Sequence, residues 1–399
     1  MSVTLLQQGG DLLLVWKQRR FHLDGHVLIA AVGLLLLGLI MVSSASLHLG
    51  EKLANDAFYY PKRQLAHALL GCVMAIGVAW VPLQVWEQKG QTLFLIGLLF
   101  LVLVLVPGLG REVNGSSRWL VLGGVRIQVS EMIKLISVLF MAGYMERRML
   151  TVRNSVWGMV RPLGLLGVAC VLLLAEPDFG AAVVIMSVAL GMMFLGGARL
   201  WQFALLLSMV GIAGVILIYT SPYRLVRVMS FLDPWADPLN TGFQLTQALI
   251  AFGRGEWFGV GLGASVQKLF YLPEAHTDFL FSVIGEELGL AGDMLVIGLF
   301  SYLLWRAFAI GRAAEIAGLR FAAFLAYGLG LWFGIQSFIN MGVNMGILPT
   351  KGLTLPLMSY GGGSIIVMCM AVAILLRVHH EVAESRGVNV KGKTVWQRA

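Results

Sequence analysis

Acidic, imidazole and hydroxyl side chains, the groups that move protons, gather between residues 272 and 289 of an otherwise apolar chain. Glu274, His276, Thr277 and Asp278 all fall within five residues. An acid costs roughly 2.5 kcal/mol or more at bilayer depth unless it is paired or hydrated. We therefore expect this stretch to form the lip of a polar cavity that opens at the outer face of a membrane.

Small and polar residues continue from this stretch into the next apolar segment with the spacing of a helix. Positions i, i+4, i+7, i+8 and i+11 hold Asp278, Ser282, Gly285, Glu286 and Gly289. Such a stripe in a membrane span faces a cavity or another helix rather than lipid. The alternative is that Asp278 only caps the start of the helix, a position that acids favour.

A second group of candidate residues leads into another apolar segment. Arg118 is followed by Glu131 and Lys134, which at i and i+3 lie on one helix face and can form an ion pair. Near the membrane surface this pair is either a structural lock or part of the cavity wall, and the sequence leaves both open.

The segment from residue 344 to residue 364 combines glycines, serines and Lys351. Glycines before a helix, with Ser359 close by, are typical of an anion-binding helix N-terminus. The alternative is a loop folded back against the bundle. The Gly-Lys-Ser/Thr order of a nucleotide-binding P-loop is missing, so we expect no nucleotide cofactor.

The elements that position these residues must lie in a bilayer. Of the 399 residues 58% are hydrophobic and only 13% charged, and the mean hydropathy is +0.82. The three cysteines lie far apart without zinc-ligand spacing, which predicts packing roles. The net charge of +8 reflects Lys and Arg that favour the inner side, so we expect both termini in the cytoplasm and no nucleic-acid partner.

The apolar segments predict an all-α integral membrane protein, a polytopic bundle of about ten transmembrane helices with long outer loops. The expected spans are 26–46, 64–82, 91–108, 130–146, 161–176, 180–197, 201–220, 278–306, 318–343 and 361–378. We expect a cytoplasmic segment 1–25, a transmembrane domain 26–378 and a cytoplasmic tail 379–399. The largest outer loop is 221–277, and its five glycines between residues 253 and 263 predict tight backbone contact.

Together these motifs resemble the SEDS family, the polytopic cell-wall proteins of bacterial shape, elongation, division and sporulation. The resemblance covers about residues 25–380. Its most specific pieces are 118–119, 261–268, 272–279, 286–289 and 349–363. Details within 274–276 and 284–287 are more similar to the division branch of the family than to the elongation branch.

The resemblance implies a peptidoglycan glycosyltransferase that polymerises lipid II on the outer face of the bacterial cytoplasmic (inner) membrane, at the division septum. The family's essential aspartate corresponds to Asp278, and its Glu–Lys pair to Glu131 and Lys134. The implied partners are a class B penicillin-binding protein transpeptidase of the FtsI type and other divisome membrane proteins.

The chemistry of that inverting reaction assigns roles to the candidates. Asp278 is expected to act as general base on the acceptor 4-hydroxyl, and cations should surround the departing diphosphate. The expected cations are Arg118, Lys134, Lys268 and Lys351. The further substrate-binding candidates are Glu131, Glu274, His276, Thr277, Ser282, Glu286 and Ser359. A divalent cation, Mg or Mn, could be held by Asp278 and Glu274.

Two other functions would use the same residues differently. A transporter that flips lipid II would pass the headgroup through the cavity, but the ionisable residues cluster in the outer third of the chain's spans, and the sequence shows no inverted repeat. A non-catalytic divisome scaffold would leave the acids of 274–287 without a purpose.

Overall fold

Helices form most of the structure, a computed structural model that describes residues 4–8, 11–16, 19–107, 110–113, 116–122, 125–349 and 352–396. Twelve helices occur in these residues. They are α1 (Gly25–Ala54), α2 (Tyr59–Ala79), α3 (Leu83–Leu105), α4 (Val129–Asn154), α5 (Val156–Ala175), α6 (Phe179–Leu195), α7 (Leu200–Tyr219), α8 (Pro222–Leu232), α9 (Phe243–Gly255), α10 (Leu280–Ile316), α11 (Arg320–Asn344) and α12 (Gly362–Trp396).

Each of the ten expected spans overlaps one helix, namely one of α1–α7 or α10–α12. In the described residues, seven helices are long and apolar enough to cross a membrane by length and composition alone. The α6 helix is apolar but has only 17 residues. The all-α membrane architecture is therefore confirmed, with the short α6 span where the sequence predicted one.

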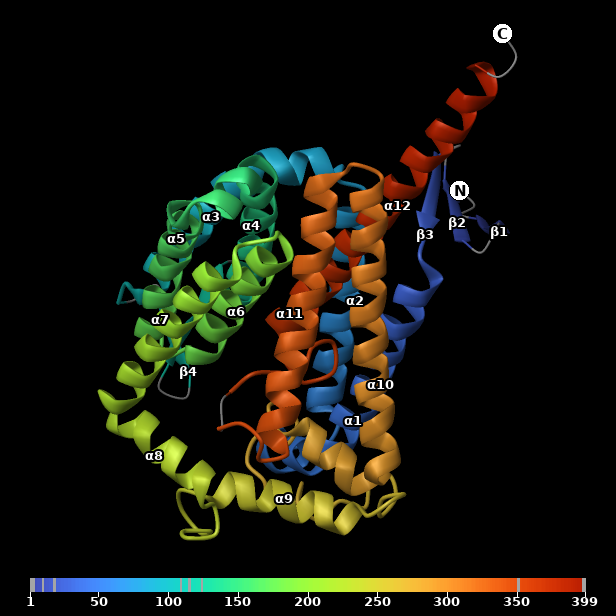
Figure 1. The fold of residues 1–399 in the computed structure, drawn as a ribbon. Coiled ribbons are helices and arrows are strands. Elements are labelled where there is room, and N and C mark those ends of the chain that lie inside the picture. The colour runs from blue at the N-terminus through green and yellow to red at the C-terminus, as the bar shows by residue number, and fades with distance from the viewer. Residues whose placement is uncertain are drawn as a thin grey trace.

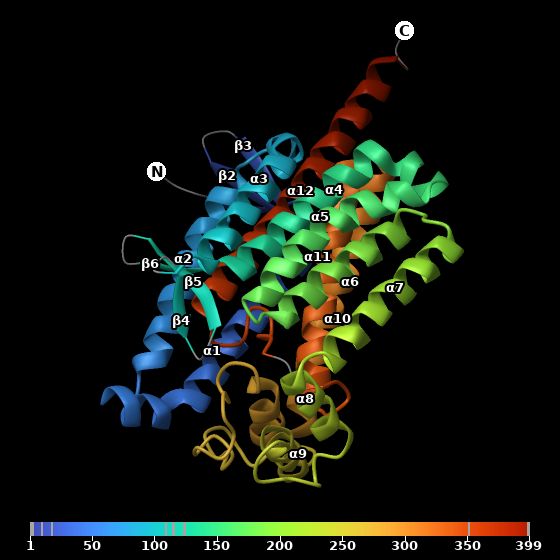
Figure 2. The same cartoon turned by 90° about the vertical axis from the view of Figure 1, so that its left-hand side faces the viewer.

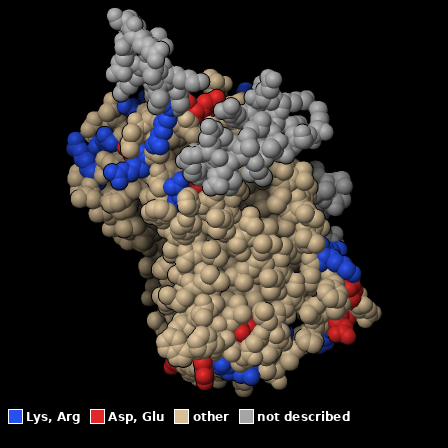
Figure 3. Space-filling view, turned by 90° about the vertical axis from the view of Figure 1, so that its right-hand side faces the viewer, with Lys and Arg blue, Asp and Glu red and all other residues tan. Residues whose placement is uncertain are grey.

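The spanning helices run side by side between two chemically different ends. Both termini lie at one end of the bundle, and α8 and α9 lie at the other (Figure 1). Figure 3 shows a broad surface without charged side chains between two ends that carry them. An uncharged belt between charged rims is the surface expected of a protein embedded in lipid.

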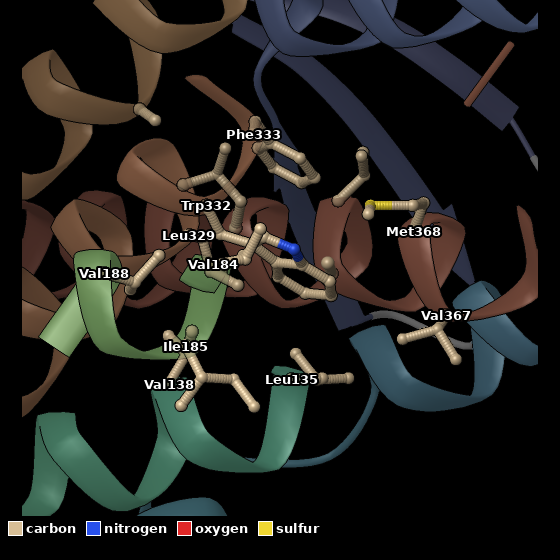
Figure 4. Packing of buried hydrophobic residues seen from close by; sticks show 14 of the residues in the cluster. Leu135, Val138, Val184, Ile185, Val188, Leu329, Trp332, Phe333, Val367 and Met368 are labelled. Carbon is tan, nitrogen blue, oxygen red and sulfur yellow. The ribbon is translucent and has the colours of Figure 1, made fainter. Parts of the chain in front are cut away.

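The bundle core is built where α4, α6, α11 and α12 meet. Trp332 of α11 lies close to Val138 of α4 and Val184 of α6 (Figure 4). Trp332 and Phe333 are fully buried. By contrast, α7 buries only Gln202 and Leu206 and lies at the edge of the bundle (Figure 2).

Two small antiparallel sheets depart from the expected organisation. The first contains β1 (Thr4–Gln8), β2 (Asp11–Trp16) and β3 (Arg19–Leu23), within the segment 1–25 for which the sequence analysis predicted no secondary structure. The second contains β4 (Gly110–Val113), β5 (Ser116–Leu122) and β6 (Val125–Gln128), in the outer loop between α3 and α4. Hairpins of this kind satisfy the backbone locally, which a loop against a membrane requires. At the other terminus, α12 continues through the expected tail as far as Trp396.

Candidate active site

Asp278 lies just before α10, not on it. The helix begins at Leu280, and its N-cap residue, Phe279, makes no side-chain cap hydrogen bond. The prediction that Asp278 shares a helix face with Ser282 is therefore wrong. The reason is a side chain from α11. In a helix, the Asp278 carbonyl would accept from the Ser282 N–H; here the Asn344 amide bridges the two, donating to Asp278 O (2.9 Å) and accepting from Ser282 N (3.1 Å).

Three amides spaced four residues apart on α11 hold the surroundings of Asp278 together, and we call Gln336, Asn340 and Asn344 the amide row. All three are buried. Asn340 Nδ2 donates to the Asp278 carbonyl (2.8 Å) and to the Leu353 carbonyl (2.6 Å). Asn344 also accepts from Ser282 Oγ at 2.8 Å. The row thus fixes the main chain at Asp278 against α11 and against the loop that precedes α12.

Gln336, the inner member of the amide row, joins the Glu131–Lys134 pair to the same loop. Lys134 Nζ lies 2.8 Å from Glu131 Oε1 and 2.9 Å from Gln336 Oε1, while Gln336 Nε2 donates to the Thr354 carbonyl. The Lys134 side chain is 1% exposed. The expected ion pair is present and acts as a buried lock in this state. Its role toward substrate stays a prediction.

Two adjacent carboxylates near the start of α10 bind residues of the outer loop and hold it in place. Glu286, fully buried, accepts from the Ser265 hydroxyl, from the Val266 and Gln267 amides, and from Arg254 at 3.0 Å. Its neighbour Glu287 binds Lys268 Nζ at 2.7 Å, and the Lys268 side chain is 3% exposed. Glu286 and Lys268 therefore have structural partners here. Their expected contacts with substrate are not tested by this geometry.

The α10 helix breaks at Gly289, and the segment 256–261 fills the break. Gly289 has φ +66° and ψ −166°, a conformation that only glycine adopts readily. The main-chain N–H groups of Val260 and Gly261 donate to the carbonyls of Glu286 and Glu287, and the amides of Leu290 and Ala291 donate to the carbonyls of Glu256 and Trp257. The tight backbone contact predicted from the glycines of 253–263 is confirmed, and a methyl carbon on Gly259 would lie 2.1 Å from the Glu287 carbonyl oxygen.

His276 lies in an aromatic cluster beside Asp278. Its ring is 4.9 Å from Tyr60 and 5.4 Å from Tyr360 between centroids, and its carbonyl accepts from the Tyr360 amide. Burial lowers the pKa of His276 below its usual range, and the Glu274 carboxylate offsets this only in part. Burial raises the pKa of Tyr360, and the nearby charge of Arg63 offsets this in part. The exposed Arg63 guanidinium of α2 lies 4.3 Å from the centroid of the Tyr59 ring, next to this cluster.

The remaining expected residues divide into loop-shaping and more exposed groups. The buried Ser359 hydroxyl accepts from the Leu355 amide and so shapes the loop before α12. Glu274 is exposed and accepts from the Thr277 hydroxyl at 2.7 Å. Asp278 is half-buried, and its carboxylate lies against Gly352, where an added methyl carbon would be 3.0 Å from Asp278 Oδ2.

Two of the expected cations cannot be placed. Lys351 lies outside the described residues, and for Arg118 the structure describes only the backbone, in β5. Both therefore stay predictions.

The sequence analysis missed the amide row and Arg63 as neighbours of Asp278. A signal was present, because Gln336, Asn340 and Asn344 recur every four residues in an apolar helix, and polar side chains in spans pack toward other helices. No comparable pattern marked Arg63, whose position depends on how α2 packs against the loop before α12.

Comparison with known proteins agrees with this architecture. Residues 25–384 match the FtsW/RodA/SpoVE family, described as cell cycle proteins. A protein of Methylococcus capsulatus called "Probable peptidoglycan glycosyltransferase FtsW" is 63% identical over 385 residues, which cover 96% of this chain and 97% of that protein. A protein of Methylomonas methanica with the same name is 59% identical over 375 residues, covering 94% and 97%.

Solved structures give the same result. A chain from a peptidoglycan synthase complex, studied for its coordination of polymerization and crosslinking, superposes with a TM-score of 0.73 at 30% identity, covering 90% of this chain and 98% of that one. The rod shape determining protein RodA of Thermus thermophilus superposes with a TM-score of 0.66 at 26% identity, covering 90% and 97%. The chain belongs to the FtsW/RodA/SpoVE family of cell cycle proteins, the SEDS family, and is most like its FtsW members.

Proposed function

We propose that this protein is a peptidoglycan glycosyltransferase that polymerises lipid II during septal wall synthesis, with Asp278 as its general base. The assignment of Asp278 as the base rests on the way its main chain is held in place. Its carbonyl is bound by two buried amides of α11, and the residue itself is half-buried just before α10, next to the outer loop that carries α8 and α9. A main chain held in this way suits proton transfer at a defined position.

In the proposed reaction, the acceptor 4-hydroxyl attacks the anomeric carbon of the donor sugar as Asp278 takes the hydroxyl proton. The new oxygen–carbon bond forms as the bond from the anomeric carbon to the diphosphate oxygen breaks, and the polyprenyl diphosphate leaves with the bonding electrons. Attack opposite the leaving group inverts the anomeric centre. The proton then passes from Asp278 to water, which restores the carboxylate for the next cycle.

Negative charge grows on the departing diphosphate, and cations should stabilise it. Lys134 and Lys268 are engaged in buried ion pairs, so either would have to exchange partners to reach a phosphate. Arg63 is exposed beside His276 and Tyr360 and needs no such exchange. We propose Arg63 as a diphosphate contact, together with Lys351 and Arg118.

A divalent cation is compatible with the residues present. Magnesium typically takes one or two protein carboxylates and completes its shell with water and substrate phosphates. Asp278 and Glu274 could supply those carboxylates, because both are at least partly exposed. The cation would neutralise diphosphate charge, and the proton transfer described above does not depend on it.

The proposed cellular setting follows from the two ends of the bundle. Both termini lie at one end, and the Lys/Arg bias favours placing that end in the cytoplasm. Asp278 then faces outward, where lipid-linked substrates arrive laterally. The structural similarity to a chain of a synthase complex supports a transpeptidase of the class B penicillin-binding protein type as partner, together with other divisome membrane proteins.

The test is polymerisation of lipid II by the purified protein with its transpeptidase partner. Asp278→Asn keeps the side-chain shape and should abolish glycan strands, whereas Asp237→Asn, at a partly exposed acid in the same outer loop, should not. Normal polymerisation by Asp278→Asn would refute the assignment of the base. If no polymer forms under any condition but labelled lipid II crosses vesicle membranes, the protein is a transporter instead.

A further inference from the structure

A groove of about 450 Å³ lies beside α9 and α10, apart from the site around Asp278. Five residues line it: Phe252, Glu256, Trp257, Leu290 and Asp293. Two of the five are acids, two are aromatic, and none is basic. None of their side chains takes part in the proposed glycosyl transfer. The groove therefore has its own chemistry, and that chemistry favours a cation.

Asp293 is the buried acid of this groove. The residue is only 7% exposed, and its Oδ1 atom has no hydrogen-bond partner within the described part of the chain. Its Oδ2 atom lies close to the Gly285 backbone, where an added methyl carbon would be 2.9 Å away. A buried carboxyl oxygen without a hydrogen-bond donor is costly, so an ammonium group entering the groove could donate to Asp293 while its charge is balanced by the exposed Glu256.

Glu256 and Trp257 complete a cation site at the rim of the groove. Both are exposed, and Trp257 is 69% exposed despite its large apolar ring. The backbone at Glu256 has φ +45°, a conformation held by the hydrogen bonds from Leu290 and Ala291 into this segment. An aromatic face with carboxylates beside it is a typical site for an ammonium group.

The groove lies at the depth of lipid headgroups. The unbroken part of α10 runs from residue 290 to residue 316, which is about 40 Å at 1.5 Å per residue and longer than the ~30 Å hydrocarbon core. Its outer end, at Leu290, therefore lies near the membrane boundary. Immediately below, Met294 and Leu295 are 59% and 53% exposed and can contact acyl chains.

We propose that this groove binds an amine-headgroup phospholipid, whose ammonium contacts Asp293, Glu256 and Trp257 and whose acyl chains run along Met294 and Leu295. The charge of the groove selects against anionic lipids without an amine. A soluble cation would not use the apolar surface below the groove, so a lipid is the occupant that matches both features.

The test measures lipid retention by native mass spectrometry after release from nanodiscs made of equal parts phosphatidylethanolamine and phosphatidylglycerol. The wild type should retain phosphatidylethanolamine preferentially. Asp293→Asn and Glu256→Gln should each lower that preference by about tenfold, the effect of losing one charge-assisted contact. Glu51→Gln removes an exposed acid at the outer end of α1 and should leave the preference unchanged.

Three outcomes would contradict the proposed lipid site. Equal retention of both lipids by the wild type, or an unchanged preference in both groove variants, would overturn the proposal. A photo-reactive residue at Trp257 that crosslinks only to another membrane protein in cells would also overturn it, because the occupant would then be a basic side chain. Glu256 is exposed, so its variant gives an answer even if Asp293→Asn does not fold. Lipid retention requires no turnover, so the outcome is independent of the proposed glycosyltransferase activity.

Discussion

Replacing Asn344 by leucine separates the positioning of Asp278 from the stability of the bundle. The Asn344 side chain makes four hydrogen bonds: to the Asp278 and Asn340 carbonyls, and to the amide and hydroxyl of Ser282. Leucine keeps the volume and removes all four. One bond can be recovered, because Ser282 N–H is free to donate to the Asp278 carbonyl and extend α10 backward. Three bonds are lost on balance, so we expect a net loss of stability of about 1.5–4.5 kcal/mol, at roughly 0.5–1.5 kcal/mol per lost bond.

Asn344→Leu should also lower the catalytic rate of the protein that remains folded. Extending α10 draws Asp278 into the helix and moves its carboxylate, and a displacement of about 1 Å can cost roughly 10²-fold in rate. The assay pairs glycan-strand formation from lipid II with thermal unfolding of the same preparation. Ser337→Ala is the matched control, because Ser337 is buried on α11 but its hydroxyl bonds only to carbonyls of its own helix.

The reasoning would be refuted if Asn344→Leu polymerised within about twofold of the wild type while Asp278→Asn was inactive. It would also be refuted if Ser337→Ala lost as much activity, since the loss would then report general packing of α11. Asn344→Gln offers a rescue test, because it retains the amide and should recover part of the rate.

Two further predictions concern charges in the bundle and in the outer loop. Lys134→Met should destabilise the protein by about 3–5 kcal/mol, because it leaves Glu131 buried without its cation. Adding Glu131→Gln to this variant should restore most of the lost thermal stability. A double variant that is no more stable than Lys134→Met would show that the two residues are not coupled. For His276, burial lowers the pKa in the folded state, so the unfolded state binds more protons as pH falls below about 6.5 and stability declines there. His276→Gln should flatten that decline in thermal unfolding between pH 7 and pH 5, and an unchanged slope would assign the pH dependence to other groups.

The sequence predicted the spans well because the bilayer imposes a single strong requirement. About 20 apolar residues are needed to cross it, and the expected spans each overlap a helix. The helix breaks were harder to predict. Asp278 was expected on a helix face, but the amide that prevents this belongs to Asn344, 66 residues further along the chain. Such long-range side-chain contacts leave no local signature.

The sequence predicted which residues belong to the candidate site better than it predicted the partners that those residues contact. Glu131 and Lys134 form the expected pair, since i, i+3 geometry determines it locally. Glu286 and Lys268 were both expected to contact substrate, yet each is bound to another part of the outer loop or of α10. A carboxylate in a membrane protein needs a partner, and the sequence alone does not show whether that partner is a substrate or the protein itself.

The break at Gly289 has a mechanical consequence. Four main-chain hydrogen bonds hold the 256–261 segment in the gap. Displacing the segment would break all four, at roughly 0.5–1.5 kcal/mol each. Because these bonds use no side chains, residues such as Phe258 can change freely while the fastening persists. A protein that pulls on this loop from outside the membrane would therefore drag the short start of α10 with it, and the force would reach the aspartate two residues before that helix.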